Sequence, residues 1–273
     1  MKAVVFAIVI AATGCEVRNV NRAATVPHMT PTLRNGAPLD APGELVLGAS
    51  SVADASIGAT DRTAGVEVPG TQLEGALRGR LGRYVTVGLI VAHGLDSTTH
   101  AIKPNQPAVD GGGPTGRGAT ITAIVPTSDP HWTVGFDLES LVWSVPWIEY
   151  SACVDNCGGT TASRSSGTSN VGQMALGVVP TYHTDRFSVW GGLTVRNHPT
   201  IQQKDVEVGV DSSGDVEAGA PNLVVSAGAD VDLGGGVRGG LTLYQVAYGT
   251  PVRYAPNLAA TLTIPLGTRD RKR

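Results

Sequence analysis

The chain has 273 residues, a formal net charge of −3 and 36 glycines. A net charge this close to zero argues against a nucleic-acid partner, which requires a strongly basic surface. The length fits a single domain. Apolar residues lack the period of a helix and instead alternate with polar ones, which indicates an all-β protein.

The first 14 residues have the features of a secretory signal peptide. A charged start, Met1-Lys2, precedes an apolar run from Ala3 to Ala12 and then small residues. The run is too short to cross a bilayer as a helix, which needs roughly 20 apolar residues. Export to an oxidising compartment permits disulfides in the mature protein.

The Ala-Thr-Gly-Cys sequence that ends at Cys15 resembles the lipobox of bacterial lipoproteins. This resemblance implies cleavage before Cys15 and acylation of its sulfur and of the new amino group. Residue Glu16 is not the Asp that retains such lipoproteins in the inner membrane, so the resemblance implies an outer-membrane destination. The alternative is an ordinary signal peptide that is cleaved elsewhere, with an incidental Cys15.

Residues 15–42 follow as a polar segment that contains Pro27, Pro31, Pro38 and Pro42. Proline favours an extended chain and interrupts both helices and sheets. We therefore expect a lipidated, mostly disordered tether between the membrane anchor and the folded domain.

Ten segments of roughly ten residues then show apolar and polar residues in alternation. In the eighth, the aliphatic set Leu223, Val225, Ala227, Ala229 and Val231 alternates with a face that carries charge and is poor in bulky apolar residues, and a Gly234–Gly236 turn follows. Side chains alternate faces along a strand, so each segment is a two-faced β-strand. The ten segments are 44–51, 71–81, 83–93, 117–126, 131–143, 171–182, 186–196, 222–233, 237–247 and 257–266.

The connections between these segments alternate in length, with tight turns after the second, fourth, sixth and eighth and longer links elsewhere. Ten residues suffice for a tilted strand to cross a bilayer, and short periplasmic turns with long outer loops are typical of outer-membrane barrels. We predict an antiparallel up-and-down transmembrane β-barrel of about ten strands (8–12) over residues 43–267. The N-terminus is then expected on the periplasmic side, with its lipid in the inner leaflet.

Two further features bear on the barrel prediction. Tyr84, Trp132 and Tyr182 fall beside tight turns, as expected for aromatic residues at a membrane–water boundary. Many such barrels finish on a strand with a terminal aromatic residue, whereas this chain ends with a basic tail over 268–273. The competing interpretation is a soluble β-sandwich or lipocalin-like barrel whose aliphatic faces point inward.

Cys153 and Cys157 remain as a pair once Cys15 is assigned to lipid attachment. Their close spacing in a Ser/Thr/Gly-rich connection favours a small loop disulfide. Two free thiols or half a metal site are the alternatives, and no second Cys/His cluster has the spacing of a zinc site.

The inward faces of the predicted strands collect charges of both signs. A ten-stranded barrel is narrow, and an unpaired buried charge is costly, so we expect a lumen filled by an ion-pair network. A narrow conducting pore and a charge-lined ligand or catalytic cavity are the alternatives. The predicted network consists of Glu44, Glu74, Arg78, Arg80, Asp137, Glu139, Arg186, Arg196, Asp230, Asp232 and Arg238.

The sequence contains no recognisable catalytic motif. Ten strands invite comparison with the omptin proteases, but His93, His100, His183 and His198 are scattered, and no residue-by-residue match to that family exists. No Gly-x-Ser-x-Gly nucleophile elbow occurs. We therefore expect a protein that is not an enzyme and that carries no cofactor or metal.

Together these features predict a monomeric outer-membrane β-barrel lipoprotein of a Gram-negative bacterium with a structural or surface-interaction role. Its partners would be outer-membrane lipid and, at the long loops, lipopolysaccharide or an extracellular ligand. The alternatives are a small pore or transporter, a barrel enzyme acting on envelope lipids or peptides, and a lipid-anchored soluble periplasmic barrel that binds an apolar ligand.

Overall fold

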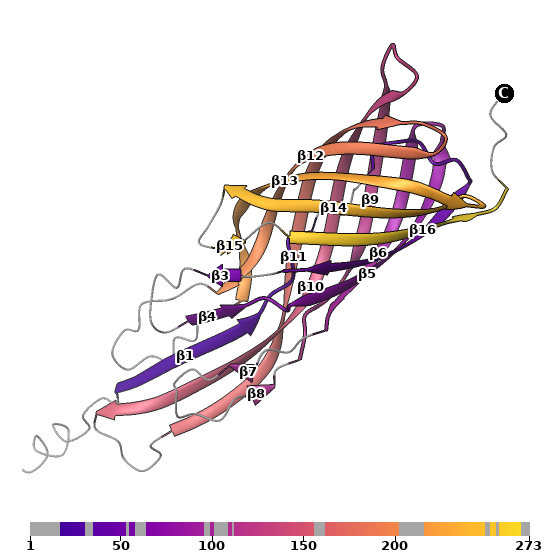
Figure 1. The fold of residues 1–273 in the computed structure, drawn as a ribbon. Helices are drawn as coiled ribbons and strands as arrows, with labels where there is room; N and C mark the ends of the chain where they lie inside the picture. The colour runs from indigo at the N-terminus through magenta and orange to yellow at the C-terminus, as the bar shows by residue number, and fades with distance from the viewer. Residues whose placement is uncertain are drawn as a thin grey trace, which may run out of the picture.

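The structure is a computed structural model that describes residues 17–30, 35–52, 55–57, 64–95, 99–100, 109–110, 112–155, 162–201, 216–248, 252–254 and 257–268. Every regular element in this part of the chain is a β-strand (Figure 1). The predicted signal peptide, Cys15, Cys157 and residues 269–273 of the basic tail lie outside the described residues.

Ten strands close into a barrel in which each strand pairs antiparallel with its neighbours along the chain. The first and last strands of the barrel pair with each other, which completes the closure. The ten strands are β2 (Gly43–Ser51), β5 (Thr71–Gly82), β6 (Val85–Gly94), β9 (Thr115–Pro126), β10 (Trp132–Asp155), β11 (Ala162–His183), β12 (Phe187–Ile201), β13 (Val216–Gly234), β14 (Val237–Tyr248) and β16 (Asn257–Leu266).

This arrangement confirms the predicted fold, because each of the ten predicted segments corresponds to one strand of the barrel. The main difference is length. The prediction ended the fifth strand at Trp143, but β10 continues to Asp155 and pairs with β11 as far as its first residue, Ala162. The β10–β11 hairpin therefore extends beyond the last residue of β10 that pairs with β9, which is Ser144.

The two ends of the barrel differ in their connections. The tight links Gly82–Val85, Pro126–Trp132, His183–Phe187 and Gly234–Val237 lie at one end, which we call the turn end. At the last of these links the three glycines have φ angles of 108°, 64° and 90°, a region that residues with a Cβ seldom adopt. We call the opposite end, where the longer connections lie, the loop end.

Six short strands belong to the N-terminal segment and to the longer connections. β1 (Val17–Thr25) pairs antiparallel with β10 and parallel with β4 (Ala64–Glu67). The remaining short strands form two pairs, β3 (Ala55–Ile57) with β15 (Val252–Tyr254) and β7 (Thr99–His100) with β8 (Val109–Asp110). All six lie toward the loop end of the barrel (Figure 1).

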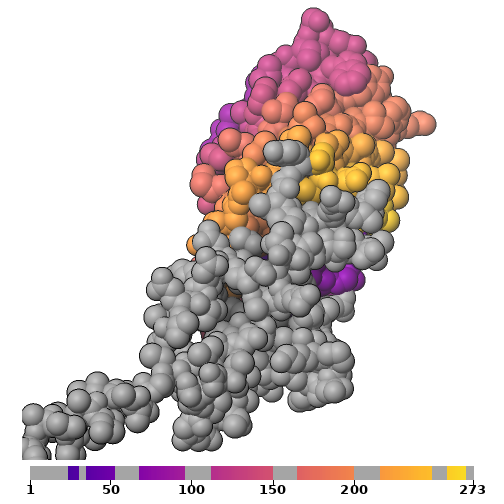
Figure 2. Space-filling model, turned by 90° about the vertical axis from the view of Figure 1, so that its left-hand side faces the viewer, coloured from indigo at the N-terminus to yellow at the C-terminus, as the bar shows by residue number. Residues whose placement is uncertain are grey.

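The aliphatic faces of the strands point away from the lumen. Along β6, for example, Leu89 is 66% exposed and Val91 60%, whereas Thr86, Ile90 and Ala92, which lie on the opposite face of the strand, are buried. In Figure 2 the coloured residues form a continuous packed surface over the upper part of the view. Leucine and valine side chains in this number are unfavourable on a surface in contact with water. The interpretation as a soluble sandwich or lipocalin-like barrel requires these faces to point inward, and the structure contradicts it.

Aromatic side chains cluster at the turn end. The Trp132 and Tyr182 rings meet edge to face with centroids 5.4 Å apart, and the Phe187 ring lies 6.1 Å from that of Tyr182. Tyr and Trp favour the boundary between hydrocarbon and water. The cluster therefore lies where a membrane boundary is expected, at the edge of the aliphatic wall.

Candidate functional site: the lumen and its N-terminal segment

The barrel lumen is occupied by the chain's own N-terminal segment. We call residues 24–42 the lumenal segment; the structure describes its parts 24–30 and 35–42. Every residue from Ala24 to Thr30 is buried, and His28 and Met29 are 0% exposed. The sequence analysis expected a mostly disordered tether over 15–42, and these described parts instead pack inside the barrel.

Near the loop end, two histidines and their partners hold the beginning of the lumenal segment. The His28 backbone N–H donates to the Gln72 side-chain oxygen at 2.9 Å, and its ring Nδ1 hydrogen-bonds with the Ser50 hydroxyl at 2.8 Å. The ring Nε2 of His198 lies 2.8 Å from the Pro27 carbonyl oxygen. The polar inner wall thus supplies the partners that an extended backbone lacks when it is buried.

Midway through the lumen, the segment contacts a buried ion pair. Arg196 donates to Glu139 at 2.6 Å and to the backbone carbonyl of Thr30 at 2.7 Å. The Thr30 hydroxyl hydrogen-bonds with Tyr244 at 3.1 Å. Because the Arg196 and Glu139 side chains are only 3% and 1% exposed, each charge depends on the other, and the segment supplies a further acceptor for the guanidinium.

Toward the turn end, the segment passes very close to the wall at Gly36. The Gly36 N–H donates to the Thr181 hydroxyl at 2.9 Å, and its carbonyl accepts from the Thr133 hydroxyl at 3.0 Å. A Cβ at this position would lie 2.5 Å from the Val179 carbonyl oxygen and 2.9 Å from the Gly135 nitrogen. Only glycine fits this close approach without movement of the backbone.

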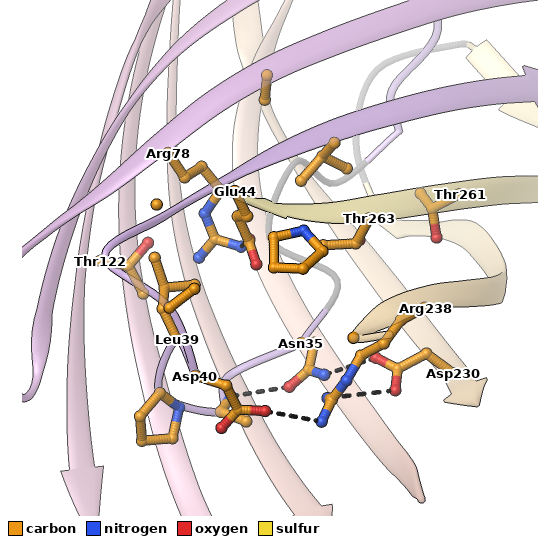
Figure 3. Close-up of a pocket in the computed structure, with 18 of the residues that line it drawn as sticks. Asn35, Leu39, Asp40, Glu44, Arg78, Thr122, Asp230, Arg238, Thr261 and Thr263 are labelled. Atoms are coloured by element: carbon orange, nitrogen blue, oxygen red, sulfur yellow. Dashed lines mark hydrogen bonds and ion pairs between the residues drawn. The ribbon is translucent and has the colours of Figure 1, made fainter. Parts of the chain in front are cut away.

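At the turn end, a cavity of about 90 Å³ separates the segment from the wall (Figure 3). Arg238 lies between two carboxylates there, 3.2 Å from Asp40 of the segment and 3.6 Å from Asp230 of β13. Asn35 of the segment donates to Asp230 at 2.7 Å. The cavity is smaller than the ~300 Å³ typical of the smallest ligand pockets, and water fits it better.

On the other side of the same cavity, Arg78 of β5 donates to Glu44 of β2 at 2.8 Å (Figure 3). Both side chains are mostly buried. The backbone carbonyl of Pro42 accepts from the Arg80 N–H at 2.9 Å, which fixes the end of the segment beside β5. The chain therefore enters β2 at the turn end of the barrel.

Several of the predicted network residues meet in the structure. Ion pairs join Glu44 with Arg78, Glu139 with Arg196, and Asp230 with Arg238. Asp137 accepts hydrogen bonds from the hydroxyls of Thr120 and Thr122, Glu74 accepts one from Gln72, and Arg80 donates to the Leu39 carbonyl. Arg186 is exposed at the turn end, and Asp232 accepts from the Gly234 N–H in the adjacent tight turn.

The sequence analysis missed the lumenal residues themselves. Val26, Met29 and Leu39 are apolar residues in a segment that was interpreted as a solvated tether, and all three are buried. Their presence, together with His28 in the same segment, was the available signal. Prolines misled the interpretation because they disfavour a regular strand ladder but do not prevent the burial of an extended chain.

Other candidate groups are dispersed. Cys153 lies in β10 opposite Arg18 in the strand register, and because Cys157 is outside the described residues, the disulfide stays a prediction. His93 hydrogen-bonds with Thr115 on the outside of the wall, whereas His198 lies inside. Among the described residues no group of three or more His, Cys, Asp and Glu side chains could hold a metal ion.

In the part of the chain that the structure describes, no helix is long and apolar enough to span a membrane.

No family model and no curated protein matches this sequence. Similar solved structures include LpxR from Salmonella typhimurium, at 10% identity over 82% of this chain and 100% of that chain, with a TM-score of 0.42. The translocator domain of autotransporter NalP from Neisseria meningitidis is 12% identical over 81% and 87% of the two chains, with a TM-score of 0.37. The beta domain of the Bordetella autotransporter BrkA is 10% identical over 83% and 100%, with a TM-score of 0.36.

Proposed function

We propose that this protein is an outer-membrane β-barrel lipoprotein whose lumen is closed and whose role is to anchor and present the structure at its loop end. The observation that carries the proposal is the lumenal segment, which contacts the inner wall near the loop end, midway, and at the turn end. A barrel whose lumen is filled in this way anchors the protein in the membrane and does not form a pore.

The aliphatic outer wall supports the membrane part of this proposal. Residues such as Leu89, Leu176 and Leu241 are more than half exposed on different strands. In a bilayer they contact hydrocarbon, whereas in water each would forfeit roughly 1.5–3 kcal/mol of burial energy. The polar residues inside then need partners, and the lumenal segment and the ion pairs provide them.

The loop end supports a surface role because it is built as an extension of the barrel. β10 and β11 continue as a paired hairpin past Ser144, and β1 and β4 add to its edge. This hairpin, with the connections that include β3, β7, β8 and β15, is the structure that the barrel would present outside the cell. Lipopolysaccharide or an extracellular ligand is the partner that this location favours.

Single-channel recording in a planar bilayer tests whether the lumen is closed. We expect no steady conductance from the purified wild-type barrel. The matched variant replaces residues 24–41 with Gly/Ser residues of equal number, which removes the side chains of the segment and keeps its length. If that variant folds, as judged by heat-modifiable gel mobility, we expect it to conduct. Steady conductance from the wild-type protein would overturn the closed-lumen proposal in favour of a small pore.

A further inference from the structure

The lumenal segment runs through the barrel in a single direction. On β12, Pro27 contacts His198 and Thr30 contacts Arg196, so the chain moves from the loop end toward the start of that strand. It then reaches Asp230, four residues before the end of β13, through Asn35.

The last contacts complete the crossing. Asp40 pairs with Arg238, the second residue of β14, and Pro42 contacts Arg80, three residues before the tight turn at Arg83. From Pro27 to Asp40 the contacts therefore move from the loop end to the turn end, where Pro42 also lies. The segment traverses the lumen once, and β2 then begins at the turn end with Gly43.

The strand before the lumenal segment lies at the loop end. β1 pairs with β10 from Trp147 to Asp155, beyond the last partner of β9 at Ser144. Because the two strands are antiparallel, Val17 lies opposite Asp155, at the far end of the hairpin (Figure 1). The sequence analysis expected the N-terminus on the periplasmic side, with the tight turns, whereas the described chain begins at the loop end.

The described residues thus make eleven passages along the barrel axis, ten in the wall and one inside it. The described N-terminal end is at the loop end, whereas β16 finishes at the turn end with Leu266. An even number of wall strands would have placed both ends on one side. The internal passage moves the N-terminal end to the other side.

We propose that the mature N-terminus is displayed at the cell surface, so that acyl groups on Cys15 lie on the outer-leaflet side of the outer membrane. The proposal rests on the proposed function, in which long loops face outward. Cys15 precedes Val17 by two residues, which span at most about 7 Å. The hydrocarbon core is about 30 Å thick, so the inner leaflet is out of reach while the lumenal segment stays in place.

Single-cysteine reporters in the full-length chain test the proposal, in a Cys153→Ser/Cys157→Ser background in which acylation blocks Cys15. The N-terminal reporters are Asn19→Cys and Val20→Cys, which lie on opposite faces of β1. Ser165→Cys in the exposed part of β11 reports the loop end, and Ser128→Cys in a tight turn reports the turn end. Heat-modifiable mobility shows which variants fold.

Intact cells are treated with a membrane-impermeant maleimide and compared with lysed cells. We expect Ser165→Cys and at least one β1 reporter to be labelled in intact cells, and Ser128→Cys only after lysis. Labelling of Ser165→Cys with both β1 reporters protected until lysis would overturn the surface display of the N-terminus and leave the proposed function standing. Labelling of Ser128→Cys in place of Ser165→Cys would instead overturn the proposed orientation of the barrel.

Discussion

Arg196 and Glu139 form an ion pair at 2.6 Å that bridges the inner face of the intervening strand β11. Both side chains are buried, and the guanidinium also donates to the backbone of the lumenal segment. The pair therefore joins the barrel wall to the chain that fills it. Its removal should affect the wall and the segment together.

We expect Arg196→Met to destabilise the folded barrel by about 3–5 kcal/mol, because it removes the guanidinium from a buried ion pair and leaves the charge of the Glu139 carboxylate in place. The double variant Arg196→Met/Glu139→Leu should lose less than the sum of the two single changes, since no charge is stranded. Urea unfolding in detergent micelles, followed by tryptophan fluorescence, measures the effect. Arg186→Gln, at an exposed position of the turn end, is the control and should change stability by less than about 0.5 kcal/mol. Additive single and double changes would show that the two side chains do not interact.

Gly36 lies so close to the barrel wall that a side chain would contact backbone atoms. We expect Gly36→Ala to lower stability by about 1–3 kcal/mol through overpacking, because its Cβ would lie 2.5 Å from the Val179 carbonyl oxygen. Gly172→Ala is the matched control, since no atom lies within 4 Å of the position of its Cβ. Equal unfolding midpoints for the two variants would contradict the close passage of the segment along β11.

The aliphatic wall predicts a dependence on depth for charged substitutions. Leu89→Arg, in the middle of β6, should destabilise the barrel by about 2–4 kcal/mol in a bilayer, whereas Leu81→Arg, beside the tight turn, should cost about 0–1 kcal/mol. Both leucines are more than half exposed. Reversible unfolding in lipid vesicles measures the two variants. If Leu81→Arg costs as much as Leu89→Arg, the turn end does not lie at a membrane boundary.

The barrel should remain in the membrane without its lipid anchor. We expect a Cys15→Ser protein, exported with a generic cleavable signal peptide, to fractionate with the outer membrane and to keep heat-modifiable gel mobility. Metabolic labelling with a fatty acid should mark the wild-type protein and not this variant. Release of the variant as a soluble monomer would mean that the aliphatic wall does not contact lipid.

The strands were predictable because their signal is local. A residue such as Leu241 needs only its neighbours Gly240 and Thr242 to show the period of two, and a tilted barrel strand needs about ten such residues. The pairing of Glu139 with Arg196 was not predictable, because strand register and tilt decide which inward charges meet. Arg186, in contrast, has the place in the alternating pattern that predicts an inward-facing residue, but it lies at the rim of the barrel, where it faces solvent.

The lumenal segment was not predictable for a different reason. Its burial depends on partners such as Gln72 and Tyr244, which are distant in the sequence and lie on separate strands. A chain that contacts the barrel wall on all sides shows neither the period of two nor the period of 3.6 in its apolar residues. The prolines that suggested a solvated tether are compatible with an extended passage through a polar lumen.

The pairing of β2 with β16 constrains the order in which the molecule is assembled. These are the first and last strands of the wall, so their hydrogen bonds form the seam that completes the barrel. The lumenal segment leads directly into β2, and its ends are fixed to opposite ends of the barrel. Laying the segment against an open sheet requires no threading, whereas inserting it after closure would pull β1 through a narrow, filled channel. Seam closure is therefore the step that traps the segment, and withdrawing it from the finished protein requires the barrel to reopen.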